Sequence, residues 1–408
     1  MDKHNQIQSK QENNFNPDIK FIVLSGLAVR KKEIDNLGYY ILPKYGEYEL
    51  WDIAPFFKEK WQNKEISFHD EIEEIDYLVK IESFQALQNK IKSLKRFNKK
   101  CFIFPFYLTE NFQIKLIKIC SELKIPYIIK ETKDHPVNSL FENQINIISI
   151  KNVFNNILKS IKFYRKNTPP LLSVLPTKTY ATKLQFSGYF QKKLYIHNNN
   201  YDKCLNLISD KENNNKINLK NYVVYIDQNL PLEPQFLKKN PKPFLQEKDF
   251  WDRMELFFNI VLSQTKSEKI VICSHPNRSS DSKSFLQEKG FIVTQYDTAL
   301  YVKHSSLVIL HCSTSVDFAV IYNKPVCFIA MSEMKEINFF LTRTEQYANL
   351  LNRKINFIEK GKVPTSINMG VDNLQYKKFL QKWIKTPGTP DINSWEYIAS
   401  YLGNNYKR

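Results

Sequence analysis

Glycine is scarce in this chain, with 9 glycines among 408 residues. The sequence contains no P-loop, no G-x-S-x-G element and no complete G-x-G-x-x-G fingerprint. Those motifs place nucleotide phosphates or a nucleophile on tight turns, so their absence argues against such sites. A D-x-D pair, which could hold a metal-bound diphosphate, is missing as well. We therefore expect no bound metal and no other cofactor.

Cysteine is also scarce, and none of the 6 cysteines forms a C-x-x-C pair. Four of them lie in or beside apolar, strand-like runs. A disulfide framework or a zinc site would need a different spacing, so we expect reduced and mostly buried thiols in a cytosolic protein. The six are Cys101, Cys120, Cys204, Cys273, Cys312 and Cys327.

Long apolar runs are missing too. No run approaches the ~20 apolar residues of a membrane-spanning helix. Residues 1–16 are polar and lack the apolar stretch of a signal peptide. We therefore expect residues 1–18 to be a disordered tail. The protein should be cytoplasmic, either soluble or peripheral on the inner face of the plasma membrane.

Positive charge is in excess, with a formal net charge of +17 at pH 7. Nucleic acid, an anionic membrane surface and anionic substrates are all compatible partners. No zinc finger or aromatic–basic RNA-binding motif occurs, which makes nucleic acid unlikely. Residues 81–97 and 151–166 combine helical apolar spacing with basic side chains on or near the other face. They are candidates for contact with anionic lipids, although solvated helix faces explain each equally well.

Strand-like and helix-like segments alternate along most of the chain, which predicts parallel, helix-covered sheets. A hydrophobic fraction of 42% is enough for the cores of two domains. The polar segment 209–218 (SDKENNNKIN) is typical of a linker or surface loop. We predict an α/β protein with two Rossmann-type domains facing an interdomain cleft. Strand-like runs occupy 19–24, 101–107, 126–129, 171–175, 222–226, 269–273, 307–310 and 325–329.

The predicted domains follow from these segments. The first would span residues 19–205 and the second residues 216–372, with the linker or loop at 206–215. We expect helices within 373–408 to pack back on the first domain.

The segment Ser313-Thr314-Ser315 follows an apolar run and precedes a helical pattern. Backbone N–H groups and the positive dipole end make a helix N-terminus attractive to a phosphate. The three hydroxyls could add donors to that phosphate. Thr314 and Asp317 also fit a capping box, so simple helix capping is an equally good explanation.

Two histidines stand at predicted strand ends. His275 follows Ser274 and precedes a proline, which ends the strand and could aim the imidazole into the cleft. A histidine there could contact a phosphate or act as a general acid, or it could have no role. His311 could reach the same anion as the hydroxyls, or it could be a buried core histidine.

Asp227 ends another predicted strand, directly before Gln228. A carboxylate at the carboxyl edge of a sheet could serve as a base or a nucleophile. It could equally be a turn aspartate that accepts a hydrogen bond from its own backbone. Asp202 follows a polar turn and could line the cleft or lie on the surface.

Taken in order, these pieces resemble bacterial glycosyltransferases of the GT-B fold that build capsule and lipopolysaccharide. The resemblance covers about residues 200–330 and is carried by Tyr201-Asp202, Tyr225-Ile226-Asp227-Gln228, Ser274-His275-Pro276 and His311-x-Ser313-Thr314-Ser315. The most similar types are the transferases that use CMP-Kdo or CMP-sialic acid. Gln228 departs from the pattern because an acidic residue is common there. The last strand–helix–strand element also resembles transferases that use CDP-glycerol.

The resemblance implies a role for each matching position. Asp227 would be the catalytic carboxylate, and His275 would contact the donor phosphate or the sugar carboxylate. Ser313, Thr314 and Ser315 would hold the nucleotide phosphate, with His311 beside them. Cleft candidates are Asp202, Gln228 and Ser274. The partners would be a nucleotide-sugar donor and a glycan or lipid-linked acceptor. A non-catalytic nucleotide- or carbohydrate-binding protein of the same fold is the alternative.

Overall fold

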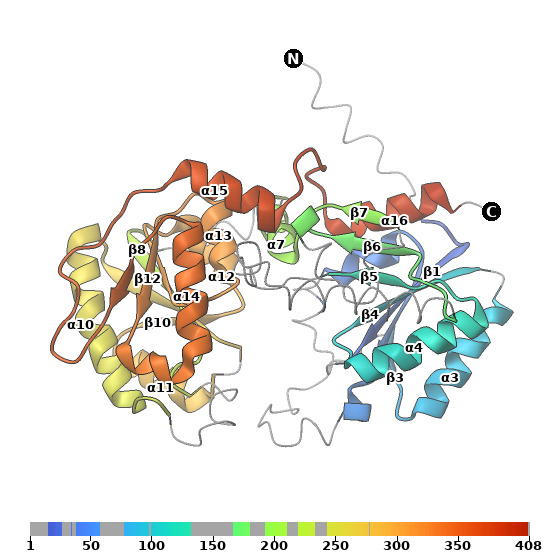
Figure 1. The fold of residues 1–408 in the computed structure, drawn as a ribbon, viewed down its shortest axis with the longest axis horizontal. Coiled ribbons are helices and arrows are strands. Elements are labelled where there is room, and N and C mark those ends of the chain that lie inside the picture. The colour runs from blue at the N-terminus through green and yellow to red at the C-terminus, as the bar shows by residue number, and fades with distance from the viewer. Residues whose placement is uncertain are drawn as a thin grey trace, which may run out of the picture. The chain divides into compact units, whose positions relative to one another are not determined.

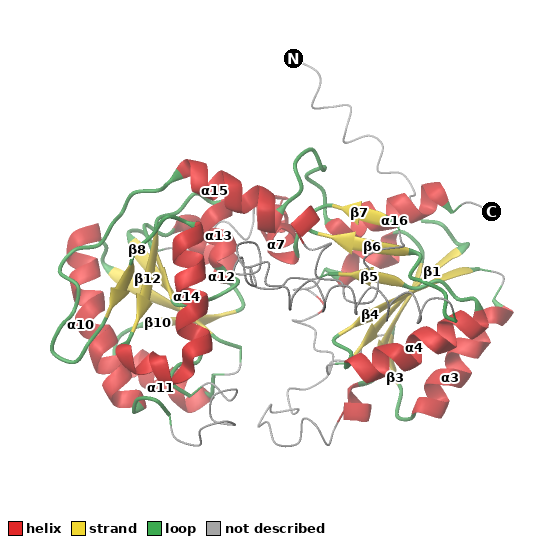
Figure 2. Ribbon diagram, in the orientation of Figure 1, coloured by secondary structure: helices red, strands yellow, loops and turns green. Residues whose placement is uncertain are grey.

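The computed structural model describes residues 15–26, 34, 38–57, 77–97, 99–131, 166–179, 192–209, 219–232, 243–276 and 278–406. The chain forms two compact units (Figures 1 and 2). The first unit holds the described residues up to 131, residues 166–199 and the C-terminal residues from 388 onward. The second unit holds the described residues within 200–387.

The first unit is built on parallel strands. Four of them pair in the order β3-β2-β1-β4, and three pair in the order β5-β6-β7. A parallel bridge between Ile103 and Tyr127 joins the two groups. The strands are β1 (Ile19–Ser25), β2 (Glu47–Asp52), β3 (Leu78–Lys80), β4 (Lys100–Phe106), β5 (Ile128–Lys130), β6 (Leu172–Leu175) and β7 (Lys193–Tyr195).

Both faces of this sheet are covered, because successive side chains of a strand point to opposite faces. Phe21 and Val23 belong to one core cluster, and the alternate residues Ile22 and Leu24 belong to the other. Helices α3 (Phe84–Ser93) and α4 (Glu110–Leu123) supply apolar side chains to the second cluster. The 3-10 helix η2 (Tyr39–Lys44) and the C-terminal helix α16 (Ser394–Asn405) supply them to the first.

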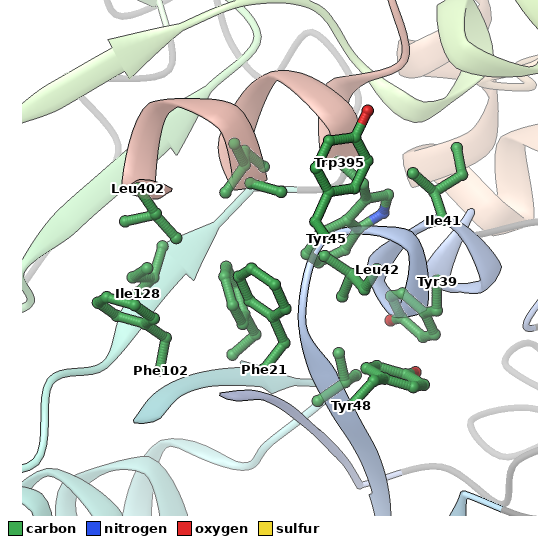
Figure 3. Close-up of a cluster of buried hydrophobic side chains, with 14 of the residues drawn as sticks. Phe21, Tyr39, Ile41, Leu42, Tyr45, Tyr48, Phe102, Ile128, Trp395 and Leu402 are labelled. Carbon is green, nitrogen blue, oxygen red and sulfur yellow. The ribbon is translucent and has the colours of Figure 1, made fainter. Parts of the chain in front are cut away.

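Helix α16 is an integral part of the first unit's core, as Figure 3 shows. The fully buried indole of Trp395 lies 5.2 Å from the ring of Phe104 and 5.3 Å from that of Tyr39, centroid to centroid. Edge-on aromatic packing of this kind adds to the free energy of area burial. The preceding helix α15 (Asn373–Phe379) lies instead in the second unit. The predicted segment 373–408 is therefore divided between the units.

The second unit contains one six-stranded parallel sheet with the order β10-β9-β8-β11-β12-β13. This is the Rossmann order, in which the first strand of the unit lies at the centre and the chain then builds outward on either side. The strands are β8 (Tyr222–Ile226), β9 (Lys269–Ser274), β10 (Ile292–Gln295), β11 (Val308–Leu310), β12 (Val326–Ala330) and β13 (Ile355–Phe357). The direction of building changes between β8 and β11.

The helices of the second unit alternate with its strands, as Figure 2 shows. They are α7 (Asn199–Ser209), α10 (Glu247–Thr265), α11 (Ser280–Glu288), α12 (Thr298–His304), α13 (Val316–Ile321), α14 (Asn338–Leu350) and α15, with the shorter turns η6 (Ser332–Ile337) and η7 (Leu380–Ile384). In the part of the chain that the structure describes, no helix is long and apolar enough to cross a bilayer.

The unit boundary falls between residues 199 and 200, ahead of the predicted linker at 206–215, whose first residues belong to helix α7. The predicted tail up to residue 14, the segment 210–215 and the basic helix predicted within 151–165 lie outside the described residues.

Candidate functional site

Three loops meet at the carboxyl edge of the second sheet. They follow the neighbouring strands β8, β9 and β11 and carry Asp227, His275 and Ser313–Ser315 respectively. In an open parallel sheet, ligands bind outside the carboxyl ends of the strands where the strand order reverses direction. The reversal here lies between β8 and β11, so these loops form the candidate site.

A buried ion pair joins the first two loops. Arg278 donates from Nε to Asp227 Oδ2 at 2.6 Å and from Nη2 to Asp227 Oδ1 at 2.8 Å, and both side chains are fully buried. The backbone N–H of His275 also donates to Oδ2, at 3.2 Å, and that of Asn229 donates to Oδ1, at 2.9 Å. Each carboxylate oxygen of Asp227 therefore accepts two hydrogen bonds.

The guanidinium of Arg278 makes further hydrogen bonds and packs against an aromatic ring. Its Nη2 also donates to the carbonyl of Leu230 at 3.0 Å, and its Nη1 to Glu247 at 3.2 Å. Its carbon centre lies 5.3 Å from the ring centroid of Trp251. Burial alone would lower the pKa of Arg278, but the Asp227 carboxylate raises it above its ordinary value. We refer to Asp227 and Arg278 together as the clamp.

The clamp defines what Asp227 does in this structure, which is to fix the loop that carries His275. Acting as a base would require this carboxylate to exchange its bonds to Arg278, so the predicted catalytic role of Asp227 stays a prediction. Sequence reasoning missed Arg278. The sequence feature that could have identified Arg278 is its position three residues after the histidine of a His-Pro pair.

His275 is half-buried. Its carbonyl accepts hydrogen bonds from the N–H of Arg278 and from Gln295 Nε2, both at 3.0 Å. Burial lowers the pKa of the imidazole, the nearby Arg278 lowers it further, and Asp227 raises it in part. The lowered pKa favours the neutral ring, which can both donate and accept a hydrogen bond. Ser274 beside it is buried and donates toward the His275 carbonyl at 3.5 Å.

Gln228 locks the loop after β8 to the loop after β11. Its Nε2 donates to the carbonyl of Cys312 and its Oε1 accepts from the N–H of Cys312, both at 2.8 Å. An amide can do both, whereas an ionised carboxylate has no proton to donate. Gln228 stands where the similar transferases commonly have an acidic residue, and these two hydrogen bonds explain the glutamine in this chain.

The hydroxyl segment forms a tight turn ahead of helix α13. The N–H of Ser315 donates to Ser313 Oγ at 3.1 Å, and the N–H groups of Val316, Asp317 and Phe318 donate to carbonyls of residues 313–315. These backbone donors are therefore already satisfied. A ligand at this turn would therefore bind the half-buried hydroxyl groups rather than the backbone N–H groups at the start of the short helix.

Helix α7 is tied to the same turn. Asn200 Nδ2 donates to the carbonyl of Thr314 at 3.1 Å and to Asp317 Oδ2 at 3.3 Å. Asp202, two residues further along α7, is buried.

His311 belongs to the core of the second unit. It is fully buried, and its ring packs against those of Tyr225 at 6.2 Å and Phe250 at 6.3 Å between centroids. Burial lowers its pKa to about 4, although the backbone of Ile329 and the Asp227 charge act in the opposite direction. Of the two readings of the sequence, the core histidine fits this placement.

Among the described residues, no group of three His, Cys, Asp or Glu side chains is arranged to hold a metal ion. The half-buried groups that these loops carry include the imidazole of His275 and the hydroxyls of Ser313–Ser315. Such groups suit a phosphate or another oxyanion better than a cation.

Comparisons with known proteins bear on the fold. No protein-family model and no curated protein matches this sequence. The structure of the wall teichoic acid polymerase TagF soaked with CDPG matches with a TM-score of 0.52 and 12% identity, over 98% of this chain and 91% of that one. The UDP-GlcNAc 2-epimerase of Methanocaldococcus jannaschii gives a TM-score of 0.46 at 12% identity, over 95% and 99% of the two chains. MurG of Acinetobacter baumannii gives 0.44 at 8% identity, over 95% and 100%.

The match to TagF extends over most of both chains and confirms the predicted GT-B-like fold built from two Rossmann-type units.

Proposed function

We propose that this protein is a transferase that moves a sugar or a polyol phosphate from a cytidine-nucleotide donor to a surface-glycan acceptor. The observation that carries the proposal is the placement of His275 and the Ser313–Ser315 hydroxyls at the carboxyl edge of the second sheet, in the loops on either side of the one after β8. Its fold is similar to that of the wall teichoic acid polymerase TagF, whose structure was determined after a soak with CDPG.

In this proposal the donor phosphate lies between the loops after β9 and β11. The hydroxyls of Ser313, Thr314 and Ser315 donate to its oxygens. The neutral imidazole of His275 donates to the oxygen that leaves with the nucleotide, or to the carboxylate of an acidic sugar. Asp227 supports this chemistry through the clamp, by holding the His275 loop in place.

The preferred donor is a CMP-activated acidic sugar, such as Kdo or sialic acid. A single phosphate and a sugar carboxylate can be bound by hydrogen-bond donors without a metal ion. CDP-glycerol and UDP-sugars are the competing donors. The acceptor would be a glycan or a lipid-linked saccharide at the inner face of the plasma membrane, bound by the first unit.

A thermal-shift series with CMP, CDP, UDP, GDP and ADP, each with and without Mg²⁺, tests the donor class. A nucleotide at 100 times its Kd stabilises the protein by about 2.7 kcal/mol. Selective stabilisation by CMP without Mg²⁺ supports the acidic-sugar donor. Selectivity for CDP moves the assignment to a CDP-linked donor, and stabilisation only with Mg²⁺ overturns metal independence. No response to any nucleotide refutes the proposal.

Two variants connect that binding to the site. Ser315→Ala removes one hydroxyl and should weaken nucleotide binding by about 1–2 kcal/mol. Its matched control is Ser366→Ala, an exposed serine in a remote loop of the same unit. His275→Gln should lower donor turnover far more than nucleotide affinity. Binding with no turnover in the unaltered protein would favour the non-catalytic alternative.

A further inference from the structure

We propose a second ligand site in the first unit, for an organic anion that carries an apolar group. The site is a cavity of about 370 Å³ at the amino-terminal edge of the first sheet. It is lined by the first residues of β4, by the residues just before β5 and β6, and by the C-terminal ends of η4 (Leu94–Arg96), α4 and α16. The volume falls within the range of small-molecule sites. This inference is independent of the function proposed for the second unit.

The interior of this cavity is apolar. Its walls combine aliphatic and aromatic side chains with the side of a proline ring, namely Leu94, Phe97, Phe102, Leu123, Ile125, Pro126, Leu171 and Tyr406. Phe97 is 45% exposed, although most large aromatic side chains of this unit are buried in its cores. An exposed aromatic side chain beside an apolar hollow is a place where a ligand can remove further apolar surface from water.

Apart from Cys101, lysines form the rest of the lining, and no Asp or Glu takes part in it. They are Lys95, Lys99, Lys100 and Lys124. Lys99 forms an ion pair with Glu47, and Lys100 donates to the carbonyl of Tyr406. Lys95 and Lys124 are exposed, and no described acidic side chain forms an ion pair with either.

The lysine charge exceeds what the local structure needs. Helix C-termini attract cations, and each carries roughly half a negative charge. Three such ends, those of η4, α4 and α16, together with Glu47 still leave the four lining lysines with an excess of about 1.5 positive charges. An anionic head between Lys95 and Lys124, with its apolar part against Phe97 and Leu123, would satisfy both features of the cavity.

Alkyl phosphates are suitable probes, since they join a phosphate to an apolar chain of chosen length. We expect octyl phosphate below its micelle concentration to bind in isothermal titration, while inorganic phosphate and octanol bind much more weakly. From butyl to octyl, affinity should rise by up to about fourfold per added CH₂ until the cavity is full. Equal binding of octyl phosphate and inorganic phosphate would overturn the proposal.

Two variants locate the binding. Lys95→Ala with Lys124→Asn removes both exposed charges, and asparagine tolerates the left-handed backbone at residue 124 (φ 54°). This pair should weaken octyl phosphate binding by about tenfold. The matched control is Lys92→Ala with Lys118→Ala, which removes two exposed lysines of α3 and α4 outside the lining. Equal weakening by the control pair would refute a built site.

The apolar wall has its own test. Phe97→Ala removes a partly exposed ring and should reduce the gain from chain length without changing the weak binding of inorganic phosphate. An unchanged gain from chain length would overturn the proposed placement of the apolar group.

A parallel experiment with phosphatidylcholine vesicles, with and without phosphatidic acid, distinguishes the source of the anion. Vesicle binding that needs phosphatidic acid and is lost in the Lys95/Lys124 pair identifies a lipid headgroup as the ligand. Binding of monomeric octyl phosphate without vesicle binding identifies a free amphiphilic anion. Binding in neither assay refutes the site.

Discussion

The fully buried His311 makes the stability of the second unit depend on pH in a definable range. A histidine whose pKa is about 4 in the folded protein and about 6.5 in the unfolded chain binds more protons when unfolded throughout the interval between these values. Acid therefore favours unfolding. Stability is fully present above pH 6.5 and is lost progressively as the pH falls toward 4.

The size of this effect follows from the two pKa values. Each pKa unit corresponds to about 1.4 kcal/mol of differential protonation free energy. Lowering the pH from 7 to 5 should remove about 2 kcal/mol of opening free energy through His311 alone. Replacement by phenylalanine, which can pack against the rings of Tyr225 and Phe250, abolishes the titration. The His311→Phe variant should therefore gain about 2 kcal/mol relative to the parent between pH 7 and pH 5.

Hydrogen exchange in strands β8 and β11, compared between parent and variant at each pH, measures this gain directly. The intrinsic exchange chemistry is the same in both proteins, and a constant cost of repacking the ring cancels from the pH difference. His304→Asn, which removes an exposed histidine, is the control and should change the pH profile much less. Parallel profiles for the parent and His311→Phe would show that His311 accepts a proton without cost, and would refute the burial argument.

Three further predictions follow from the contacts of the two units. Asp227→Asn leaves the buried Arg278 with only the partly exposed Glu247 as a counter-charge and should cost about 3–5 kcal/mol in urea unfolding, much of it recovered in a double variant with Arg278→Met. Additive costs would contradict the clamp. Gln228→Glu cannot donate to the Cys312 carbonyl and should cost about 1–3 kcal/mol at pH 7, whereas an unchanged midpoint would refute the coupling of the two loops. Trp395→Ala should lower the protection of β1 and β4 amides by about 3–5 kcal/mol, and intact protection would show that α16 is dispensable to that core.

The strands of the second unit could be predicted because they are short, continuous apolar runs. Residues 222–226, 269–273, 307–310 and 325–329 match β8, β9, β11 and β12 to within one residue. Sheets buried on both faces need such runs, so the sequence pattern is strong. The order of the strands could not be read from the same pattern, because pairing joins segments far apart in the chain.

The candidate site was only partly predictable, because being at the end of a strand does not determine where a side chain points. His311 and Ser313 are two residues apart, yet the first is in the core and the second is half-buried in the turn. Arg278 was missed because its importance comes from a contact with Asp227, 51 positions earlier in the chain. Such long-range pairs leave no local periodicity in the sequence.

These contacts change how loss-of-function variants in the proposed transferase should be interpreted. The clamp and the Gln228–Cys312 pair hold the three loops at the switch point through contacts within the protein itself. Loops ordered in advance spare a ligand the entropy of ordering them, which strengthens binding without any new contact. A variant of Asp227 would then lose activity by releasing the His275 loop, even if its carboxylate never reaches the donor. Measuring stability and nucleotide affinity together for Asp227→Asn separates that positioning effect from a direct chemical role.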